Sequence, residues 1–228
     1  MSTSPRLYGY WRSSATWRVR WAFALKELPY EYVPVNILKG ETQAPAHLAR
    51  HPLGMLPVLE TAPGAMLVES LAMLEWLDER YPETYALYPG CADDRATVRA
   101  LCEIINSGTA PLQTPRAQKH HSDDPEKRAE WGTHFTREGL RTFDRLRENV
   151  LARPFHDEKI DVESAPFSLG ARVTAADLCL VPQIYNALRF KIDVANEFPR
   201  LWRIYENSLR TRACSDASPE RQSDAPAT

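Results

Sequence analysis

Hydrophobic residues follow a mixed pattern in the first third of the chain. Short apolar runs with the length and the aromatic or β-branched content of strands fall at 7–11, 30–35, 56–59 and 65–68. Apolar residues at helical spacing occupy 15–28 and 70–77. A strand, a helix and a strand joined by short connections predict a right-handed parallel crossover. Residues 6–81 are therefore expected to form an α/β domain.

From about residue 94 the pattern becomes wholly helical. Apolar positions recur at helical spacing over 98–105, 131–150 and 197–209, and a capping box of Thr174 and Asp177 begins another helix. Residues 82–93 carry the proline and glycine of a linker. The pattern predicts an all-helical domain over 94–212, in which Asp177 has a structural role.

Two segments follow no period. Residues 152–168 are expected to form a loop of unknown role. Residues 213–228 are polar and contain proline, serine and aspartate, so they are expected to form a disordered tail.

Composition and charge narrow the range of partners. Of the 228 residues 43% are hydrophobic, enough to build a core. The 28 Lys plus Arg against 30 Asp plus Glu give a formal charge of -2, so no strong field attracts nucleic acid or an anionic membrane. No stretch approaches the ~20 apolar residues of a membrane span, and the start of the chain lacks a signal-peptide core. We expect a cytoplasmic protein that binds neither nucleic acid nor membrane.

The cysteines point to the same compartment. They form no CxxC pair and no ligand-spaced cluster with histidine, so neither a metal site nor a disulfide framework is expected. A reducing cytosol suits this usage. The four are Cys91, Cys102, Cys179 and Cys214.

The turn at Ser13 and Ser14 is the strongest candidate for chemistry. It joins the strand at 7–11 to the helix that follows, and Ser13, Ser14 or Thr16 can cap that helix. The start of a helix presents unpaired N–H groups and a positive dipole end, which favour a phosphate, a carboxylate or a thiolate. The two serines alone also fit simple capping.

Two further pairs stand at places where a ligand could be held. Leu56 and Pro57 open an apolar strand and are a candidate cis bond, although an ordinary trans turn fits the dipeptide as well. Glu69 and Ser70 stand at the start of a helix, where a capping serine after a solvated glutamate is the ordinary interpretation.

Two stretches carry a resemblance to a known family. Residues 13–20 read Ser-Ser-Ala-Thr-Trp-Arg-Val-Arg, which resembles the Ser-Ser-Cys-x-Trp-Arg-Val-Arg signature of zeta-class glutathione transferases. Residues 176–183 match the Ala-Asp-Leu-Cys-Leu-Val-Pro-Gln segment of that family. The family includes maleylacetoacetate isomerase and, more distantly, maleylpyruvate isomerase. The chain departs from it at Ala15, where the family's usual residue is cysteine. It also departs at 152–168, which exceed the family's length for this connection, so the resemblance implies that this loop is inserted.

The resemblance implies a fold, a cosubstrate and a partner. It implies an α/β thioredoxin-like N-terminal domain that binds glutathione, followed by an all-α C-terminal domain, usually in a homodimer. The cis-proline would make Leu56 pair with the cysteinyl unit of glutathione as an added strand does. The implied glutathione contacts are Ser13, Ser14, Leu56, Pro57, Glu69 and Ser70.

The implied reaction is the glutathione-dependent cis–trans isomerisation of a maleyl-type dicarboxylate, in the catabolism of aromatic amino acids. Ser13 is the first choice for the donor to the glutathione thiolate, with Ser14 as its neighbour. Arg12 and Arg189 are the candidate cations for the substrate carboxylates. Gln113 is a weaker candidate for the substrate pocket. Ala15 implies that reductive dehalogenation, which needs a protein cysteine, is absent.

Several alternatives remain open from the sequence. The chain could be a general glutathione transferase or peroxidase acting on α-halo acids or other electrophiles, or a non-catalytic binding module. Tyr8 and Tyr10 are rival hydroxyls, ranked below the serines as core aromatics. The charges of Arg18 and Arg20 fit a solvated helix face.

Overall fold

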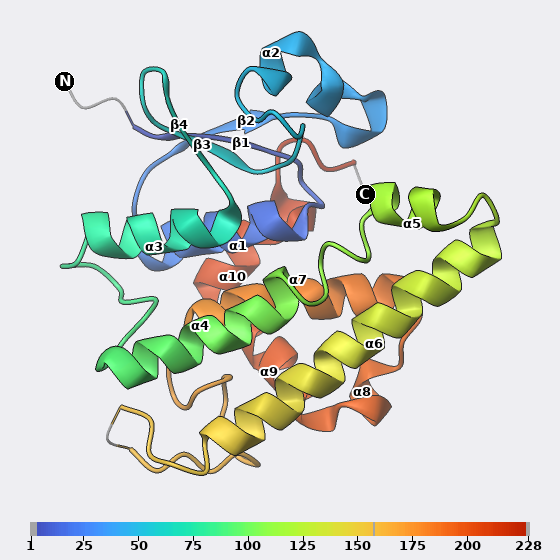
Figure 1. Cartoon of the computed structure of the whole chain (residues 1–228). Helices are drawn as coiled ribbons and strands as arrows, with labels where there is room; N and C mark the ends of the chain where they lie inside the picture. The colour runs from blue at the N-terminus through green and yellow to red at the C-terminus, as the bar shows by residue number, and fades with distance from the viewer. Residues whose placement is uncertain (1–3, 157, 227–228) are drawn as a thin grey trace. The chain divides into compact units, whose positions relative to one another are not determined.

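The computed structural model describes residues 4–156 and 158–226, and these form two compact units. The first unit takes the chain up to Leu87 and resumes at Thr211. The second spans Tyr88–Arg210 and is helical. Figure 1 follows the chain through both units by colour.

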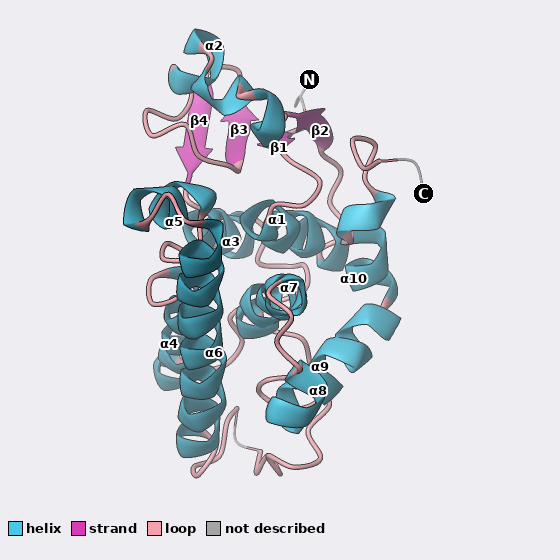
Figure 2. Ribbon diagram, turned by 90° about the vertical axis from the view of Figure 1, so that its right-hand side faces the viewer, coloured by secondary structure: helices cyan, strands magenta, loops and turns pink. Residues whose placement is uncertain are grey.

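The first unit is built on a four-stranded mixed sheet (Figure 2). Its strands are β1 (Arg6–Gly9), β2 (Glu31–Pro34), β3 (Val58–Ala62) and β4 (Ala65–Val68), in the order β2-β1-β3-β4. The pairing of β1 with β2 is parallel, whereas β1 with β3 and β3 with β4 are antiparallel. The predicted parallel crossover from β1 to β2 and the thioredoxin-like topology are confirmed.

Two helices cover one face of this sheet. Helices α1 (Ser14–Leu25) and α3 (Ser70–Arg80) pack against each other side by side (Figures 1 and 2). Their apolar side chains are buried together with Leu7 and Leu59 of the strands. The short helix α2 (Pro45–Leu48) and the 3-10 turns Ile37–Lys39 and Glu41–Gln43 lie between β2 and β3 in the chain.

The prediction of a disordered tail over 213–228 is wrong for 213–226, and residues 227–228 lie outside the described part. Helix α10 (Arg212–Ala217) and the 3-10 turn Pro219–Arg221 follow Thr211, and α10 packs on α1. The buried residues are small, namely Cys214, Ala217 and Pro219. The polar composition did not indicate that this segment is ordered, because it is held by hydrogen bonds to residues distant in the sequence.

The second unit consists of helices arranged around α7 (Ala175–Arg189), most of whose residues are buried. Helix α7 packs against α4 (Ala92–Asn106), α6 (Pro125–Val150) and α9 (Pro199–Arg210). The short helices are α5 (Pro115–His121) and α8 (Val194–Glu197). The predicted all-helical character of this region is confirmed.

The capping box that begins α7 is present. The Thr174 N–H donates to Asp177 Oδ2 at 2.8 Å, and the Ser168 N–H donates to Asp177 Oδ1 at 2.7 Å. Asp177 is fully buried, so these donors replace the water it would otherwise bind. The arrangement supports the structural role expected for Asp177.

Residues 152–168 form no helix or strand element in their described part, which excludes residue 157. They are nevertheless fixed in place. The buried Arg147 guanidinium on α6 donates to the Ser168 carbonyl at 2.7 Å and to the Val162 carbonyl at 3.1 Å. One isolated bridge pairs Phe155 with Glu158. The loop is thus anchored by a buried charge on the helix before it.

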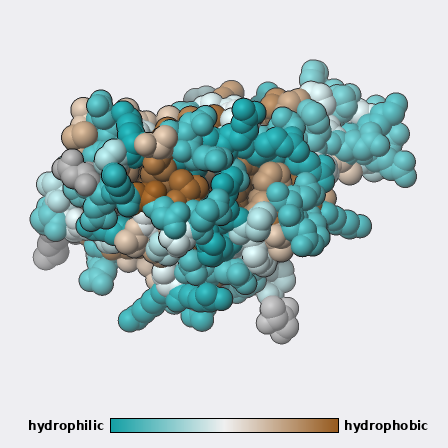
Figure 3. Space-filling view, turned by 90° about the horizontal axis from the view of Figure 1, so that it is seen from below, coloured by the Kyte–Doolittle hydropathy of each residue, from teal (hydrophilic) through white to brown (hydrophobic). Residues whose placement is uncertain are grey.

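The face shown in Figure 3 is predominantly polar. On this face, hydrophilic residues surround small hydrophobic patches. Among the described residues no helix is both long enough and apolar enough to cross a membrane.

Candidate active site

The end of β1 is brought against the start of α1 by a glycine. A Cβ atom added to Gly9 would lie 2.3 Å from Cγ2 of Thr16 and 2.9 Å from the Tyr32 ring. No side chain fits there, so the strand and the first turn of the helix can approach only with glycine at this position. The close approach sets where the Ser13 turn stands above the sheet.

Ser13 is the N-cap of α1. Its backbone is extended, with φ -70° and ψ 119°, and its Oγ accepts a hydrogen bond from the Thr16 N–H at 3.2 Å. Its own N–H donates to the Tyr10 carbonyl at 3.0 Å. The capping predicted for this turn therefore belongs to Ser13, and Ser14 is the first residue of the helix.

This cap still leaves donors for an anion. The Ser13 hydroxyl uses an oxygen lone pair toward Thr16, so its proton can be donated elsewhere. The N–H groups of Ser14 and Ala15 belong to the first turn and have no carbonyl of their own helix to reach. The positive end of the α1 dipole adds to these donors. A thiolate at this turn would be stabilised by all three.

The Leu56-Pro57 peptide bond is cis, as predicted. It immediately precedes β3, and Leu56 packs against the buried cluster of Tyr8, Val35 and Val58. The segment before it is supported by the buried His47, whose Nε2 lies 2.9 Å from the Met55 carbonyl oxygen. The backbone contact that Leu56 was predicted to make with glutathione stays a prediction.

Glu69 and Ser70 form the start of α3. Glu69 has a left-handed backbone with φ 67°, rare for a residue with a Cβ, and its side chain is exposed. Ser70 is buried, and its Oγ accepts a hydrogen bond from Nη1 of Arg18 at 3.1 Å. The Ser70 turn is therefore tied to α1, the same helix that begins at Ser13.

Arg18 and Arg20 correct the sequence analysis. A solvated helix face was left open as an alternative for both side chains, yet they are 1% and 0% exposed. Arg18 joins α1 to the start of α3, and Arg20 binds carbonyl groups before and after the helix. Their partners are 52 and up to 197 residues away, so only the three-dimensional structure reveals them. The one local signal was their place on a helix rich in tryptophan.

The two arginines predicted to bind the substrate, Arg12 and Arg189, lie in different environments. Arg12 is half-buried, with its guanidinium carbon 5.3 Å from the centre of the Trp11 ring. Arg189 is exposed at the last position of α7, with Nη1 3.4 Å from Asn186 Oδ1. Their roles toward a substrate stay predictions.

Gln113 belongs to a buried amide network of the helical unit. Its Nε2 donates to Gln183 Oε1 at 2.6 Å, and its Oε1 accepts from Gln183 Nε2 at 2.9 Å and from the Thr136 hydroxyl at 2.9 Å. This network accounts for the burial of Gln113 without a ligand. Its assignment to the substrate pocket is not tested and stays a prediction.

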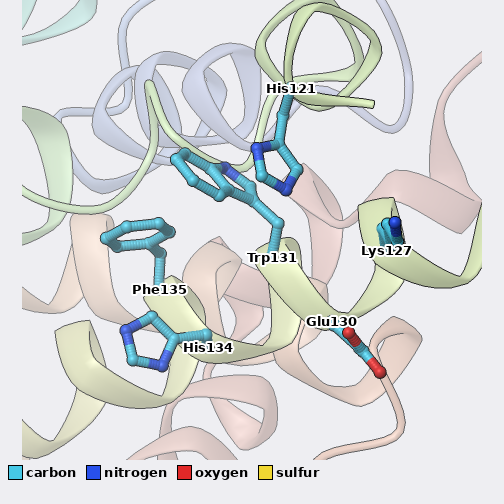
Figure 4. Close-up of a pocket in the computed structure, with 6 residues that line it drawn as sticks. All are labelled: His121, Lys127, Glu130, Trp131, His134 and Phe135. Atoms are coloured by element: carbon cyan, nitrogen blue, oxygen red, sulfur yellow. The ribbon is translucent and has the colours of Figure 1, made fainter. Parts of the chain in front are cut away.

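A separate pocket of about 500 Å³ lies on the helical unit, between α5 and α6 (Figure 4). Its aromatic residues bind one another: the His121 ring stacks on Trp131 at 4.1 Å, and Trp131 meets Phe135 edge to face at 4.6 Å. Trp131 also donates to the Leu112 carbonyl at 2.7 Å. The lining residues are His121, Lys127, Glu130, Trp131, His134 and Phe135. The pocket contains none of the predicted site residues.

In the described part of the chain, no group of three or more His, Cys, Asp or Glu side chains is arranged to hold a metal ion. The cysteines there form no disulfide; three are buried and Cys91 is exposed. The candidate site is therefore the group of elements in the first unit: the Ser13 turn, the Leu56-Pro57 bond and the Ser70 turn.

The elements of the candidate site lie in a segment that matches a known domain family. Residues 7–85 match the model of the glutathione S-transferase N-terminal domain. A probable maleylacetoacetate isomerase 2 of Drosophila melanogaster is 34% identical over 224 residues, covering 97% of this chain and 91% of the relative.

Solved structures agree over nearly the whole chain. Maleylacetoacetate isomerase from Anaeromyxobacter dehalogenans 2CP-1, solved with glutathione (GSH) bound in the active site, is 41% identical with a TM-score of 0.83, covering 98% of both chains. The same protein has been solved with dicarboxyethyl glutathione and citrate in the active site. A bacterial zeta-class maleyl pyruvate isomerase has a TM-score of 0.85 and 32% identity, covering 97% of this chain and 100% of that one. The chain belongs to the zeta-class glutathione transferase family, the family of the maleylacetoacetate isomerases.

Proposed function

We propose that this protein is a glutathione-dependent cis–trans isomerase of a maleyl-type diketo acid. One observation carries the proposal: Ser13 caps the start of α1, where its hydroxyl and the first N–H groups suit an anion, in a chain 41% identical to a glutathione-bound maleylacetoacetate isomerase. The buried link from Arg18 to Ser70 holds a second polar turn to the same helix. Together these elements suit a bound tripeptide.

The principal task of the site is to keep a thiol ionised. A free thiol has a pKa near 8.5 and is mostly protonated at neutral pH, and each unit by which the pKa falls requires about 1.4 kcal/mol. A hydrogen bond to a charged group contributes ~1.5 to 3 kcal/mol, and the helix dipole adds ~0.3 to 1 kcal/mol. The Ser13 hydroxyl, the first-turn N–H groups and the α1 dipole can therefore lower the thiol pKa below neutral pH.

Bound glutathione would supply the nucleophile that adds to the cis double bond and is eliminated after rotation, so it is not consumed. The residues of this chain hold and orient the bound glutathione. Ser13 donates to the sulfur, with Ser14 beside it. Ser70 and the first N–H groups of α3 bind the γ-glutamyl carboxylate, and Glu69 lies near the γ-glutamyl amine. Leu56, fixed by its cis bond to Pro57, pairs with the cysteinyl backbone.

The substrate carboxylates need cations, and the proposal assigns Arg12 and Arg189 to them. A guanidinium can bind a carboxylate through two parallel hydrogen bonds. The citrate and dicarboxyethyl glutathione bound to the Anaeromyxobacter relative are polycarboxylates, which supports a site for this charge type. Maleylacetoacetate and maleylpyruvate share the maleyl group, so the proposal is stated for that class.

The proposal also covers the oligomeric state and the cellular compartment. The resemblance to the zeta class supports a homodimer, which light scattering coupled to size-exclusion chromatography measures. Cysteines that form no disulfide among the described residues suit a reducing compartment such as the cytoplasm, which localisation of the tagged full chain would test.

The function is tested by turnover. Purified protein is mixed with glutathione and, in parallel, with maleylpyruvate, maleylacetoacetate and an uncharged halogenated aromatic electrophile. The proposal expects isomerisation of a maleyl acid at rates well above conjugation of the electrophile. Conjugation alone would establish a general transferase, and binding of glutathione with no turnover would establish a binding module.

A further inference from the structure

The backbone of Trp11, two residues before Ser13, is held on both sides. Its N–H donates to Oδ2 of Asp224 at 2.9 Å, and its carbonyl accepts from Nη2 of Arg20 at 3.0 Å. Asp224 lies 213 residues later in the chain, in the segment expected to be disordered. The C-terminal segment therefore contacts the turn that carries Ser13.

Arg20 connects three parts of the first unit from a fully buried position. Besides Trp11, its Nε donates to the Ala217 carbonyl at the end of α10 at 3.0 Å, and its Nη1 lies 3.5 Å from the Tyr10 carbonyl oxygen. That Tyr10 oxygen also accepts from the Ser13 N–H. One guanidinium thus joins the C-terminal segment to the strand end that leads into the turn.

Tyr32 closes the cluster from β2. Its hydroxyl donates to Asp224 Oδ2 at 3.3 Å, and the Arg20 guanidinium carbon lies 5.8 Å from its ring centre. Burial lowers the pKa of Arg20 and raises the pKa of Tyr32, which keeps the phenol protonated as a donor. Among the described residues, Asp224 Oδ2 thus accepts from the Trp11 N–H and the Tyr32 hydroxyl, and the Arg20 charge interacts with Asp224.

These contacts fix the chain on the N-terminal side of Ser13, whereas α1 fixes it on the other side. A displacement of a reacting group by about 1 Å can lower a rate ~100-fold. Small shifts of the Trp11 backbone would therefore change how the Ser13 hydroxyl and the first-turn N–H groups meet an anion.

We propose that Asp224, in the C-terminal segment, and Arg20, on α1, together hold the Ser13 turn in the geometry that ionises glutathione. The inference rests on the proposed function, since it takes Ser13 as the residue that faces the thiol. Asp224 and Arg20 are positioning residues, because they contact the backbone of the turn.

The test uses full-length variants and two readouts, the ultraviolet absorbance of the bound thiolate as pH is varied and steady-state kinetics. Asp224→Ala removes the acceptor of the Trp11 N–H. The expected result is a raised pKa of the bound thiol and about a tenfold fall in kcat at neutral pH, below the ~100-fold that full misplacement can cost. Glutathione affinity should stay within about twofold, because its peptide contacts lie at Leu56 and Ser70. The loss in kcat should shrink as pH rises and the thiol ionises.

Two variants separate positioning from general loosening. Asp224→Asn keeps a carbonyl oxygen for Trp11 and Tyr32, and Oδ1 of Asp224 accepts no hydrogen bond from the described residues, so an amide nitrogen can replace it. It should restore most of the thiol ionisation. Asp216→Ala removes a carboxylate of the same segment that binds Arg212 and Arg221 on the surface, and it should match the wild type.

An unchanged thiol pKa in folded Asp224→Ala, or an equal shift in Asp216→Ala, would overturn the positioning role. A wild-type protein that ionises bound glutathione but isomerises no maleyl acid would refute the proposed function alone, because the thiol titration needs no isomerisable substrate. A wild-type protein that does not ionise glutathione would refute both.

Discussion

At the scale of single residues, Ser13 has two tasks that a suitable pair of substitutions can separate. It caps α1 through Thr16, and it is the proposed donor to the thiolate. Ser13→Ala should lower kcat by ~10- to 100-fold with glutathione affinity nearly intact, since a hydrogen bond to a charged group contributes ~1.5 to 3 kcal/mol. It should also lower the free energy of unfolding by about 1 kcal/mol through the lost cap. Stopped-flow kinetics and urea unfolding measure the two effects.

Ser13→Asp is the matched control. Aspartate is as good an N-cap as serine, so stability should be retained, but its charge would repel the thiolate and raise the thiol pKa. Ser14→Ala should be milder than Ser13→Ala in both respects, because Ser14 follows the cap. If Ser13→Asp kept full activity, the hydroxyl would be a cap and nothing more.

Arg189 is the residue that tests substrate choice by the helical unit. Arg189→Ala should raise KM for the dicarboxylate by roughly ten- to a hundredfold, the effect of losing a charge-assisted contact. Activity toward an uncharged electrophile should hardly change. Arg210→Ala removes another exposed arginine at a helix end and serves as the control. Equal losses on both substrates would assign Arg189 a structural role and leave Arg12 as the next candidate.

At the scale of elements, the start of α7 should be a stability determinant with no part in the chemistry. Asp177→Ala leaves the N–H groups of Ser168 and Thr174 buried without their acceptor, at about 1 to 3 kcal/mol for each unsatisfied group. Calorimetry should show a large fall in Tm, whereas kcat per folded molecule should stay at the wild-type value. A fall in kcat without a fall in Tm would contradict this assignment. Asp161→Ala, which removes an exposed carboxylate bound to Ser164, is the control.

The elements also show what the sequence could predict. Strands, helix starts and the cis-proline follow from signals within a few residues, and these were confirmed for β1, α1, α7 and Pro57. The burial of Arg18 and Arg20 depends on partners in distant segments, so the local sequence left a solvated face open for them. The order of residues 213–226 was missed for the same reason, because Arg20 and Trp11 supply its partners.

At the scale of the whole molecule, each unit has its own source of stability and its own share of the proposed chemistry. The first unit contains every predicted glutathione contact. It is formed by the chain up to Leu87 and by the segment that begins at Thr211. The helical unit contains Gln113 and Arg189, the latter at the end of the largely buried α7. The proposed site should therefore be sensitive to substitutions near the C-terminus, although no local sequence signal connects that segment with the site.

The central claim is that glutathione acts as a catalyst at the Ser13 turn, and its stoichiometry tests this most directly. Proton NMR can follow a maleyl acid and glutathione together, with glutathione supplied at a small fraction of the substrate concentration. The account predicts complete conversion of the cis acid to the trans acid with the glutathione signals unchanged at the end. Conversion that stops when the glutathione has been used, or a conjugate that accumulates in its place, would contradict it.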